Sequence, residues 1–224
     1  MRFSLGTLAF LLAAGICLSE DSWWSSKPLV DQKVPTKDPW CHNQVDAFIL
    51  NELQANGLTP SPQASPLVLI RRVTYDLTGL PPTPTEVQEF ISAYKANPDK
   101  AYSILVDRLL DSPSYGERFA RHWLDVARFA ESHGFEHDYD RKYAFHFRDF
   151  VIRALNSDMP YNTFVQRQIA GDELEPDNPE ALAATGFLGA GVYPTQITLS
   201  EAERIRFDAT DDMIATMGSA MLAT

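Results

Sequence analysis

The sequence predicts an all-α fold, an irregular multi-helix domain with short loops that are marked by prolines. Apolar residues recur every three or four positions along most of the chain, as they do on the buried face of a helix. At five of the expected helix starts an Asn, Ser or Thr stands directly before a proline, which is a typical N-terminal arrangement. Residues 189–199 have β-branched character, but Pro194 interrupts them, so they do not predict a sheet.

The composition is that of a globular protein with an acidic surface. The chain has 224 residues, of which 45% are hydrophobic and 22% charged, and its formal net charge is −11. Nucleic acids and anionic membrane surfaces bind proteins with a basic footprint. We therefore expect no nucleic-acid partner.

Residues 1–19 have the features of a secretory signal peptide. Arg2 precedes an apolar stretch that ends at Ile16 and is shorter than the ~20 residues of a spanning helix. Small residues at Cys17 and Ser19 suit cleavage before Glu20, and a lipid anchor on Cys17 is a weaker alternative. We expect export to the periplasm or cell surface, with membrane contact only if this segment stays uncleaved.

Residues 20–41 predict an extended leader, because they contain three prolines and no helical periodicity. Cleavage would leave Cys41 as the single cysteine. One thiol can form no internal disulfide. We therefore expect the domain that follows to be held together by packing alone.

The helix starts share one kind of chemistry. The capping side chain accepts a hydrogen bond from a free backbone N–H, and proline in the first turn has no N–H to leave unpaired. The pairs are Ser65-Pro66, Thr83-Pro84, Asn97-Pro98, Ser112-Pro113 and Asn178-Pro179. Reciprocal capping boxes are also predicted at Thr83 with Glu86, Ser114 with Glu117, and Ser200 with Glu203.

Apolar stripes support the helices behind these starts. The clearest are Val87, Phe90, Ile91 and Tyr94; Leu105, Val106 and Leu109; and Phe147, Phe150, Val151 and Leu155. We expect helices from His42 to a stop at Gly57, over 114–132 with a stop at Gly134, over 144–155, and from about Glu201 to the end. The last segment stays apolar to Thr224, so we expect the helical domain, residues 42–224, to be truncated at its C-terminal end.

Five stretches of the chain carry a family resemblance. They are VDAFILNELQANGLTPSP (45–62), LIRRVTYDLTGLPPTPTEVQEF (69–90), LVDRLLDSPSYGERFARHWLDVARFAESHGFEHDYDR (105–141), FRDFVIRALNSDMPYNTFVQRQIAGDEL (147–174) and ATGFLGAG (184–191). Together they resemble the cytochrome-associated domain of unknown function of large exported planctomycete-type proteins. The resemblance runs from residue 45 to the end.

This resemblance implies partners and a cofactor. The domain typically lies between an N-terminal c-type cytochrome module and an uncharacterised C-terminal domain, so both are expected partners within a longer protein. Family members usually continue past a segment like DDMIATMGSAML into C-A-R-C-H-D-H, which attaches a c-type haem. This chain ends before that point and has no C-x-x-C-H. A c-type haem is thus implied in the missing continuation, and the domain would pack beside it to support electron transfer or oxidative chemistry.

A candidate polar pocket lies on the helix expected over 114–132. Its residues are Arg118, His122, Asp125, Arg128 and Glu131. The first four trace one stripe at helical spacing, and a neighbouring carboxylate can fix the tautomer of an imidazole. The alternative is a salt-bridge network that orients this helix against helix 144–155 through Arg148 and Asp149.

Candidate ligands for a divalent metal follow in His133, His137, Asp138 and Asp140. Mixed imidazole and carboxylate ligands suit zinc, iron or manganese, and the chain would then be a metal-dependent hydrolase that uses the 122–140 cluster. HGFEH (133–137) also has the H-x-x-E-H form of some zinc proteases, although Gly134 inside such a helix costs about 1 kcal/mol. A solvated charged loop is the simpler alternative.

A third alternative is a non-catalytic module that binds a carbohydrate or a protein partner. Trp23 and Trp24 could stack on sugar rings. In a proline-rich leader they could equally hold the leader against the domain.

Overall fold

The computed structural model describes residues 27–35, 38–135 and 137–222. Over these residues the chain forms helices and no strand, with one isolated β-bridge between Ser132 and Asp140. The predicted all-α fold is therefore confirmed. The predicted signal peptide, Trp23, Trp24 and Glu136 lie outside the described residues. No helix within the described ranges is long and apolar enough to cross a membrane.

The chain divides into two compact units, one up to Pro62 and one from Gln63 onward. The first unit contains α2 (Gln44–Ala55), which begins with a capping box. Asn43 Oδ1 accepts a hydrogen bond from Asp46 N at 3.0 Å, and the Asp46 carboxylate accepts one from Asn43 N at 3.1 Å. The helix is followed by Gly57 in the left-handed conformation, as the sequence predicts.

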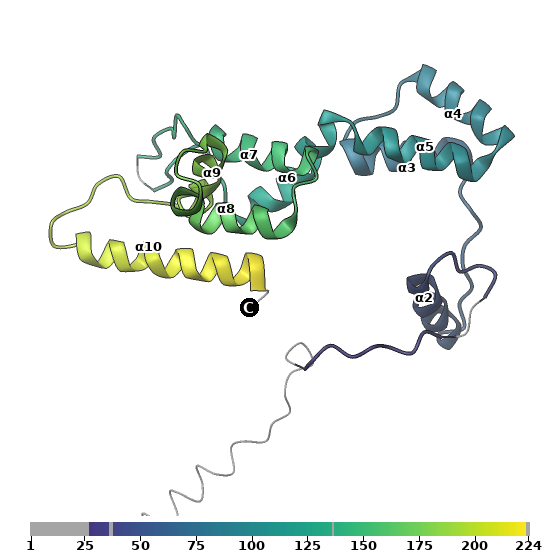
Figure 1. Cartoon of the computed structure of the whole chain (residues 1–224), viewed down its shortest axis with the longest axis horizontal. Coiled ribbons are helices and arrows are strands. Elements are labelled where there is room, and N and C mark those ends of the chain that lie inside the picture. The colour runs from purple at the N-terminus through teal and green to yellow at the C-terminus, as the bar shows by residue number, and fades with distance from the viewer. Residues whose placement is uncertain (1–26, 36–37, 136, 223–224) are drawn as a thin grey trace, which may run out of the picture. The chain divides into compact units, whose positions relative to one another are not determined.

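The second unit contains the remaining helices (Figure 1). They are α3 (Pro66–Thr78), α4 (Pro84–Ala96), α5 (Pro98–Leu110), α6 (Pro113–Val126), α7 (Phe145–Asn156), α8 (Tyr161–Leu174), α9 (Pro179–Ala184), the 3₁₀ turn η2 (Thr185–Phe187), α10 (Ala202–Met217) and the π-helical turn η3 (Gly218–Leu222).

Helices α3, α4 and α5 enclose a small core of their own. Its most buried large side chains are Ile70, Leu105 and Leu109, and the last two lie on a stripe that the sequence predicts. The capping box of α4 is also confirmed, because Thr83 N donates to Glu86 Oε2 at 2.7 Å and Glu86 N donates to Thr83 Oγ1 at 3.3 Å. The Glu86 carboxylate also pairs with Arg108 of α5 at 2.5 Å, which joins two of the helices.

Helices α6 to α9 and η2 form the main core. Its centre is aromatic and almost completely buried, with Phe147, Phe150, Phe164 and Phe187 as the largest members. Gln168 of α8 is the buried polar side chain beside them: it accepts a hydrogen bond from Trp123 Nε1 at 2.6 Å and donates one to Phe164 O at 2.9 Å. A buried amide is tolerated only when it is hydrogen-bonded, so this contact fixes the depth of α6 against α8.

Helix α6 ends at Val126, six residues earlier than predicted. Phe129 N donates to Leu124 O at 2.9 Å and Arg128 N to Asp125 O at 3.1 Å, the two bonds of a Schellman motif. The left-handed residue is Arg128, with φ of 57°, rather than the expected Gly134. The sequence did not predict this stop, because glycine usually occupies the left-handed position at the end of a helix.

Two of the three predicted capping boxes are wrong. The N-cap of α6 is Ser112, whose Oγ accepts from Ser114 N at 3.3 Å. Helix α10 begins at Ala202, and its N-cap residue Glu201 makes no side-chain cap. In both cases the N-cap residue lies one or two positions away from the expected one.

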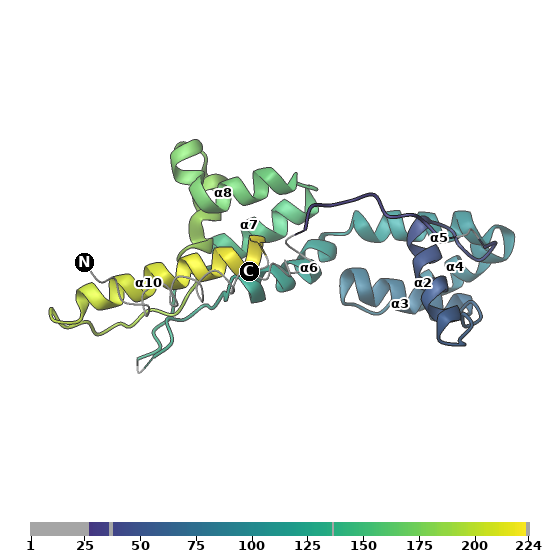
Figure 2. The same cartoon turned by 90° about the horizontal axis from the view of Figure 1, so that it is seen from below.

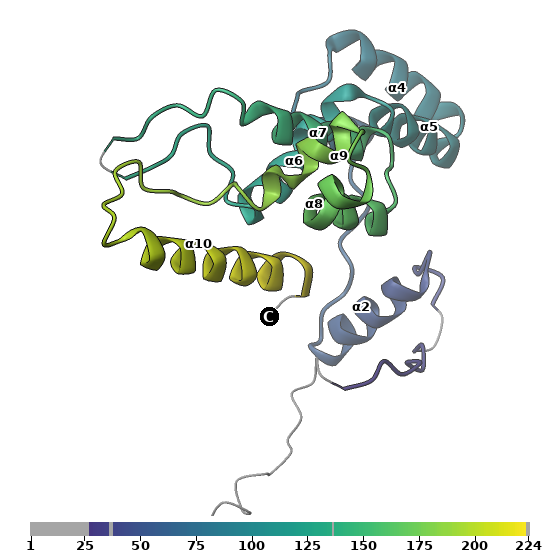
Figure 3. The same ribbon diagram turned by 60° about the vertical axis from the view of Figure 1, so that its left-hand side comes forward.

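Two long segments without helix lie side by side in the second unit, residues 127–144 and 188–201 (Figures 2 and 3). Tyr193 N donates to His133 O at 3.1 Å between them, and His133 N donates to Tyr139 O at 3.0 Å within the first. These bonds give loop 127–144 a defined course, and α10 follows from the second segment.

The glycine at position 116 lets α6 and α7 approach each other. A Cβ at Gly116 would lie 2.6 Å from Ile152 O and from the Asn156 side chain, and the Asn156 side chain accepts a hydrogen bond from Gly116 N at 2.8 Å.

We expect Gly116→Ala to lower the free energy of unfolding by about 1–3 kcal/mol, measured by urea denaturation, although alanine favours a helix. Gly189→Ala is the control, since its Cβ would meet its nearest atom at 3.9 Å. Equal stability of the two variants would contradict the close-approach argument.

Glu86 should give the second unit a pH-dependent stability. Hydrogen bonds from the Thr83 backbone, the Thr83 hydroxyl and Arg108 lower the pKa of Glu86 from 4.5 to about 2. Because the folded-state pKa is lowered, the stabilisation is complete above pH 4.5 and is lost as the pH falls towards 2. We expect Glu86→Gln to cost about 1 kcal/mol at pH 7 and to flatten the urea-measured stability profile over this window. Exposed Glu89, changed to Gln, is the control and should do neither.

Candidate functional site

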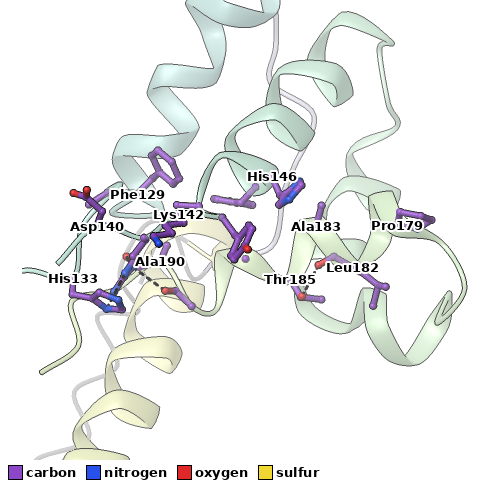
Figure 4. Close-up of a pocket in the computed structure, with 17 residues that line it drawn as sticks. Phe129, His133, Asp140, Lys142, His146, Pro179, Leu182, Ala183, Thr185 and Ala190 are labelled. Atoms are coloured by element: carbon purple, nitrogen blue, oxygen red, sulfur yellow. Dashed lines mark hydrogen bonds between the residues drawn. The ribbon is translucent and has the colours of Figure 1, made fainter. Parts of the chain in front are cut away.

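A pocket of about 850 Å³ lies between loop 127–144 and the region of α7, α9 and η2 (Figure 4). Figure 4 shows His133 at one end of the pocket and Pro179 and Leu182 at the other, with Lys142 and His146 between them. Its size is within the range of small-molecule and cofactor sites. We treat this cavity, the loop–helix pocket, as the candidate site.

Aromatic and aliphatic side chains form the wall of the loop–helix pocket. Phe129 and Phe147 have ring centroids 6.2 Å apart, and α9 adds Leu182 and Ala183. A Cβ on Gly186 would lie 2.6 Å from Phe147 Cβ, so glycine is needed for η2 to approach α7. The wall is therefore fixed by close packing in the main core.

The rim of the loop–helix pocket is cationic although the chain as a whole is acidic. Its ionisable lining residues are Arg141, Lys142, His133, His146 and Asp140. The lining thus contains two basic side chains and one carboxylate, in a chain with a formal net charge of −11. A local charge opposite to that of the whole protein attracts anionic groups to this place.

Arg141 organises one side of the pocket. Its Nη1 donates to Gly189 O and Ala190 O, both at 3.1 Å, and its Nη2 donates to Gly191 O at 2.6 Å. Burial lowers the pKa of the guanidinium below its ordinary value, but arginine stays charged at neutral pH. One side chain thereby fixes three consecutive carbonyls and joins the two long loops.

The same guanidinium also orients an imidazole. Arg141 Nε donates to His133 Nδ1 at 3.3 Å. With Nδ1 as acceptor, the neutral His133 ring carries its proton on Nε2. His146 is an exposed imidazole on the same rim, where it lies 4.1 Å from the Phe145 ring and 6.3 Å from the Tyr143 ring, centroid to centroid.

A smaller pocket of about 400 Å³ adjoins the first and shares His133 and Arg141 with it. Next to it, Arg128 Nη1 forms an ion pair with Asp212 of α10. A Cβ on Gly191 would lie 2.5 Å from Asp212 Oδ2, so the loop backbone packs directly against this pair. The Nε and Nη2 atoms of Arg128 are buried and have no hydrogen-bond partner in the described structure.

The five residues of the predicted polar pocket are dispersed, and none of them lines the loop–helix pocket. Arg118 lies against Gly79, Arg128 pairs with α10, and Asp125 and Glu131 are exposed. Glu131 does accept from Arg148 Nη1 at 2.7 Å, and Arg148 Nε donates to Asp149 at 3.0 Å. Glu131 lies in loop 127–144, beyond the end of α6, so the first contact joins this loop to α7. Both the polar pocket and its alternative, a salt-bridge network that orients α6 against α7, stay predictions.

The predicted metal ligands are engaged in other contacts. His133 accepts from Arg141; His137 stacks on Tyr139, with centroids 5.4 Å apart; and Asp138 accepts from Gly134 N at 2.7 Å. Hydrogen bonds from Ser132, then from Gly134, lower the pKa of Asp138. Over residues 27–35, 38–135 and 137–222, no three His, Cys, Asp or Glu side chains are grouped to hold a metal ion. The metal site stays a prediction.

Arg141 and Lys142 are not among the site residues that the sequence predicts. The carbonyl partners of Arg141 are 48 to 50 residues away along the chain, and no local pattern shows such a contact. One signal was available: the small residues of ATGFLGAG (184–191) include Thr185, Gly186, Gly189 and Ala190, which line the pocket.

Fold and site together define an all-α domain with an apolar pocket whose rim is cationic. Residues 44–224 match the family PSCyt2, which is described as a protein of unknown function (DUF1549). The match covers most of the chain, and the chain therefore belongs to this family. No curated protein and no solved structure matches it. The resemblance to a domain of unknown function is confirmed, while the cytochrome association, the planctomycete-type context and export stay predictions.

We expect Arg141→Lys to loosen loop 188–201. A lysine ammonium cannot reproduce the planar fork that reaches three carbonyls at once. Hydrogen exchange of amides 189–193 should become at least ~10-fold faster, because about 1.4 kcal/mol of local stability corresponds to that factor. Arg121→Lys is the control, since Arg121 is exposed on α6. Unchanged exchange in Arg141→Lys would contradict the role of this side chain.

Proposed function

We propose that this chain is the helical module of an exported, cytochrome-associated protein, and that its loop–helix pocket packs against a c-type haem. The module would support electron transfer or oxidative chemistry together with the cytochrome and C-terminal domains of a longer protein. The observation that carries the proposal is the combination of an apolar wall with a cationic rim in an acidic chain.

The residues of the pocket are suited to such a group. A haem presents a flat apolar ring and two propionate carboxylates. Phe129 and Phe147 would cover part of the ring, Lys142 would pair with a propionate, and Arg141 would add positive potential while it holds the loop. When it is bound, a c-type haem supplies one-electron transfer.

The chain's own residues would contribute in two ways. The wall built from Phe129, Phe147 and Leu182 would exclude water from the group that it covers, and lower solvent exposure is one of the factors that set a haem potential. The rim cations would stabilise negative charge at the pocket edge, more strongly than in bulk water because the wall is apolar. Export to the periplasm or cell surface is part of the same proposal.

The test is a titration of the purified chain with a proteolytic haem peptide, in which a c-type haem is attached to a short C-x-x-C-H segment. We expect saturable binding, followed by Soret absorbance. Lys142→Gln should weaken it about 5-fold, which corresponds to the ~1 kcal/mol of an exposed ion pair. Ala183→Trp, which would fill the pocket, should abolish it. Lys100→Gln removes the same charge from exposed α5 and should have no effect.

Circular dichroism spectra of all the variants must match that of the unmodified chain, so that a loss of binding reports on the pocket. The absence of saturable binding would overturn the proposal. So would equal affinities of Lys142→Gln, Ala183→Trp and Lys100→Gln, because binding would then take place elsewhere.

A further inference from the structure

A separate pocket of about 290 Å³ lies between α6 and the α7–α8 junction. Its lining includes the aromatic rings of Tyr115, Phe119, Trp123 and Phe164, and exposed Tyr161 and Asp158 complete its edge. We call it the aromatic pocket. It shares no residue with the loop–helix pocket, and the inference drawn from it is independent of the proposed function.

The rings of the aromatic pocket support one another. The Tyr115 and Phe119 centroids are 4.7 Å apart, those of Trp123 and Phe164 are 4.9 Å apart, and the latter pair meets edge to face. Trp123 is also held through Nε1 by Gln168, which is fully buried. A pocket with fixed walls loses little conformational entropy when a ligand binds.

A carboxylate lies in the lining of the same pocket, on a backbone whose conformation is fixed. Asp158 adopts the left-handed conformation, with φ of 49°, directly after α7. Asp158 N donates to Leu155 O at 3.2 Å and Met159 N donates to Ala154 O at 2.9 Å, which closes the helix end. The side chain therefore starts from a defined backbone position. The other ionisable residues in the lining are His122, Tyr115 and Tyr161.

We propose that the aromatic pocket binds a small organic cation that carries an alkylated ammonium group. The faces of aromatic rings are negative and attract cations, most strongly where water is excluded. Asp158 supplies the matching charge, and the net charge of −11 favours the approach of cations over anions. The volume of about 290 Å³ lies at the lower limit for ligand sites, which suits a compact headgroup.

Choline is the probe, and its neutral isostere, in which a quaternary carbon replaces the ammonium nitrogen, is the reference ligand. We expect choline to bind the purified chain saturably, as measured by calorimetry. The isostere should bind at least ~5-fold more weakly, since cation–π attraction is worth about 1 kcal/mol. Equal affinities would mean that the site recognises only apolar shape and would overturn the proposal.

Asp158→Asn tests the carboxylate without disturbing the fold, because asparagine also tolerates the left-handed conformation. It should weaken choline binding about 5-fold and leave the isostere unaffected. Asp211→Asn, which removes the same charge from an exposed site on α10, is the control and should bind like the unmodified chain. Equal loss in both variants would reduce the effect to net charge and would overturn the assignment.

Discussion

The loop–helix pocket depends on one partly buried interaction, the contact of the Arg141 guanidinium with three consecutive backbone carbonyls, at residues 189 to 191. Two long segments without regular structure meet at this point, and their backbone groups must find partners once they are covered. A guanidinium can satisfy several acceptors in one plane and keeps its charge when partly buried. It therefore serves as the partner that a strand or helix would otherwise provide.

This arrangement explains the positive charge at the rim of the loop–helix pocket. Arg141 is placed there for a structural reason, and it brings a permanent positive charge to the edge of an apolar wall. Lys142 follows it directly in the chain, and His133 is held by the same guanidinium. A structural requirement of the loops thus gives an acidic protein a cationic rim.

The fold could largely be predicted from the sequence, because the information that sets it is local. The Asn–Pro, Ser–Pro and Thr–Pro pairs act within one helical turn, and the stripe through Phe147, Phe150 and Val151 follows from helical periodicity. The end of α6 was not predictable in this way. Arg128 takes the left-handed position usually held by glycine, and its side chain is paired with Asp212, 84 residues away.

The site was harder to predict for the same physical reason. Motif spacing predicts a site from residues that lie one helical turn apart, such as His122 and Asp125. The loop–helix pocket and the smaller pocket beside it are instead lined by two segments that are distant in the sequence, residues 129–147 and 179–213. The aromatic pocket combines both kinds of contact. Its α6 residues Tyr115, Phe119 and Trp123 recur every four positions along the sequence, whereas Asp158 and Phe164 enter only when α7 and α8 pack against that helix.

Arg128 connects the site to α10 through its ion pair with Asp212, and its other two side-chain nitrogens have no hydrogen-bond partner. Buried guanidinium groups normally have all their donors satisfied, and a left-handed residue other than glycine adds backbone strain. Both features occur at one residue, where loop 127–144, Gly191 and α10 meet. The ion pair with Asp212 offsets only part of this cost, because Nη1 alone is engaged. The junction of α10 with the two loops is therefore less completely satisfied than the Arg141 contact beside it. On this basis, a rearrangement at the edge of the pocket nearest α10 would break fewer satisfied hydrogen bonds than one at the Arg141 contact.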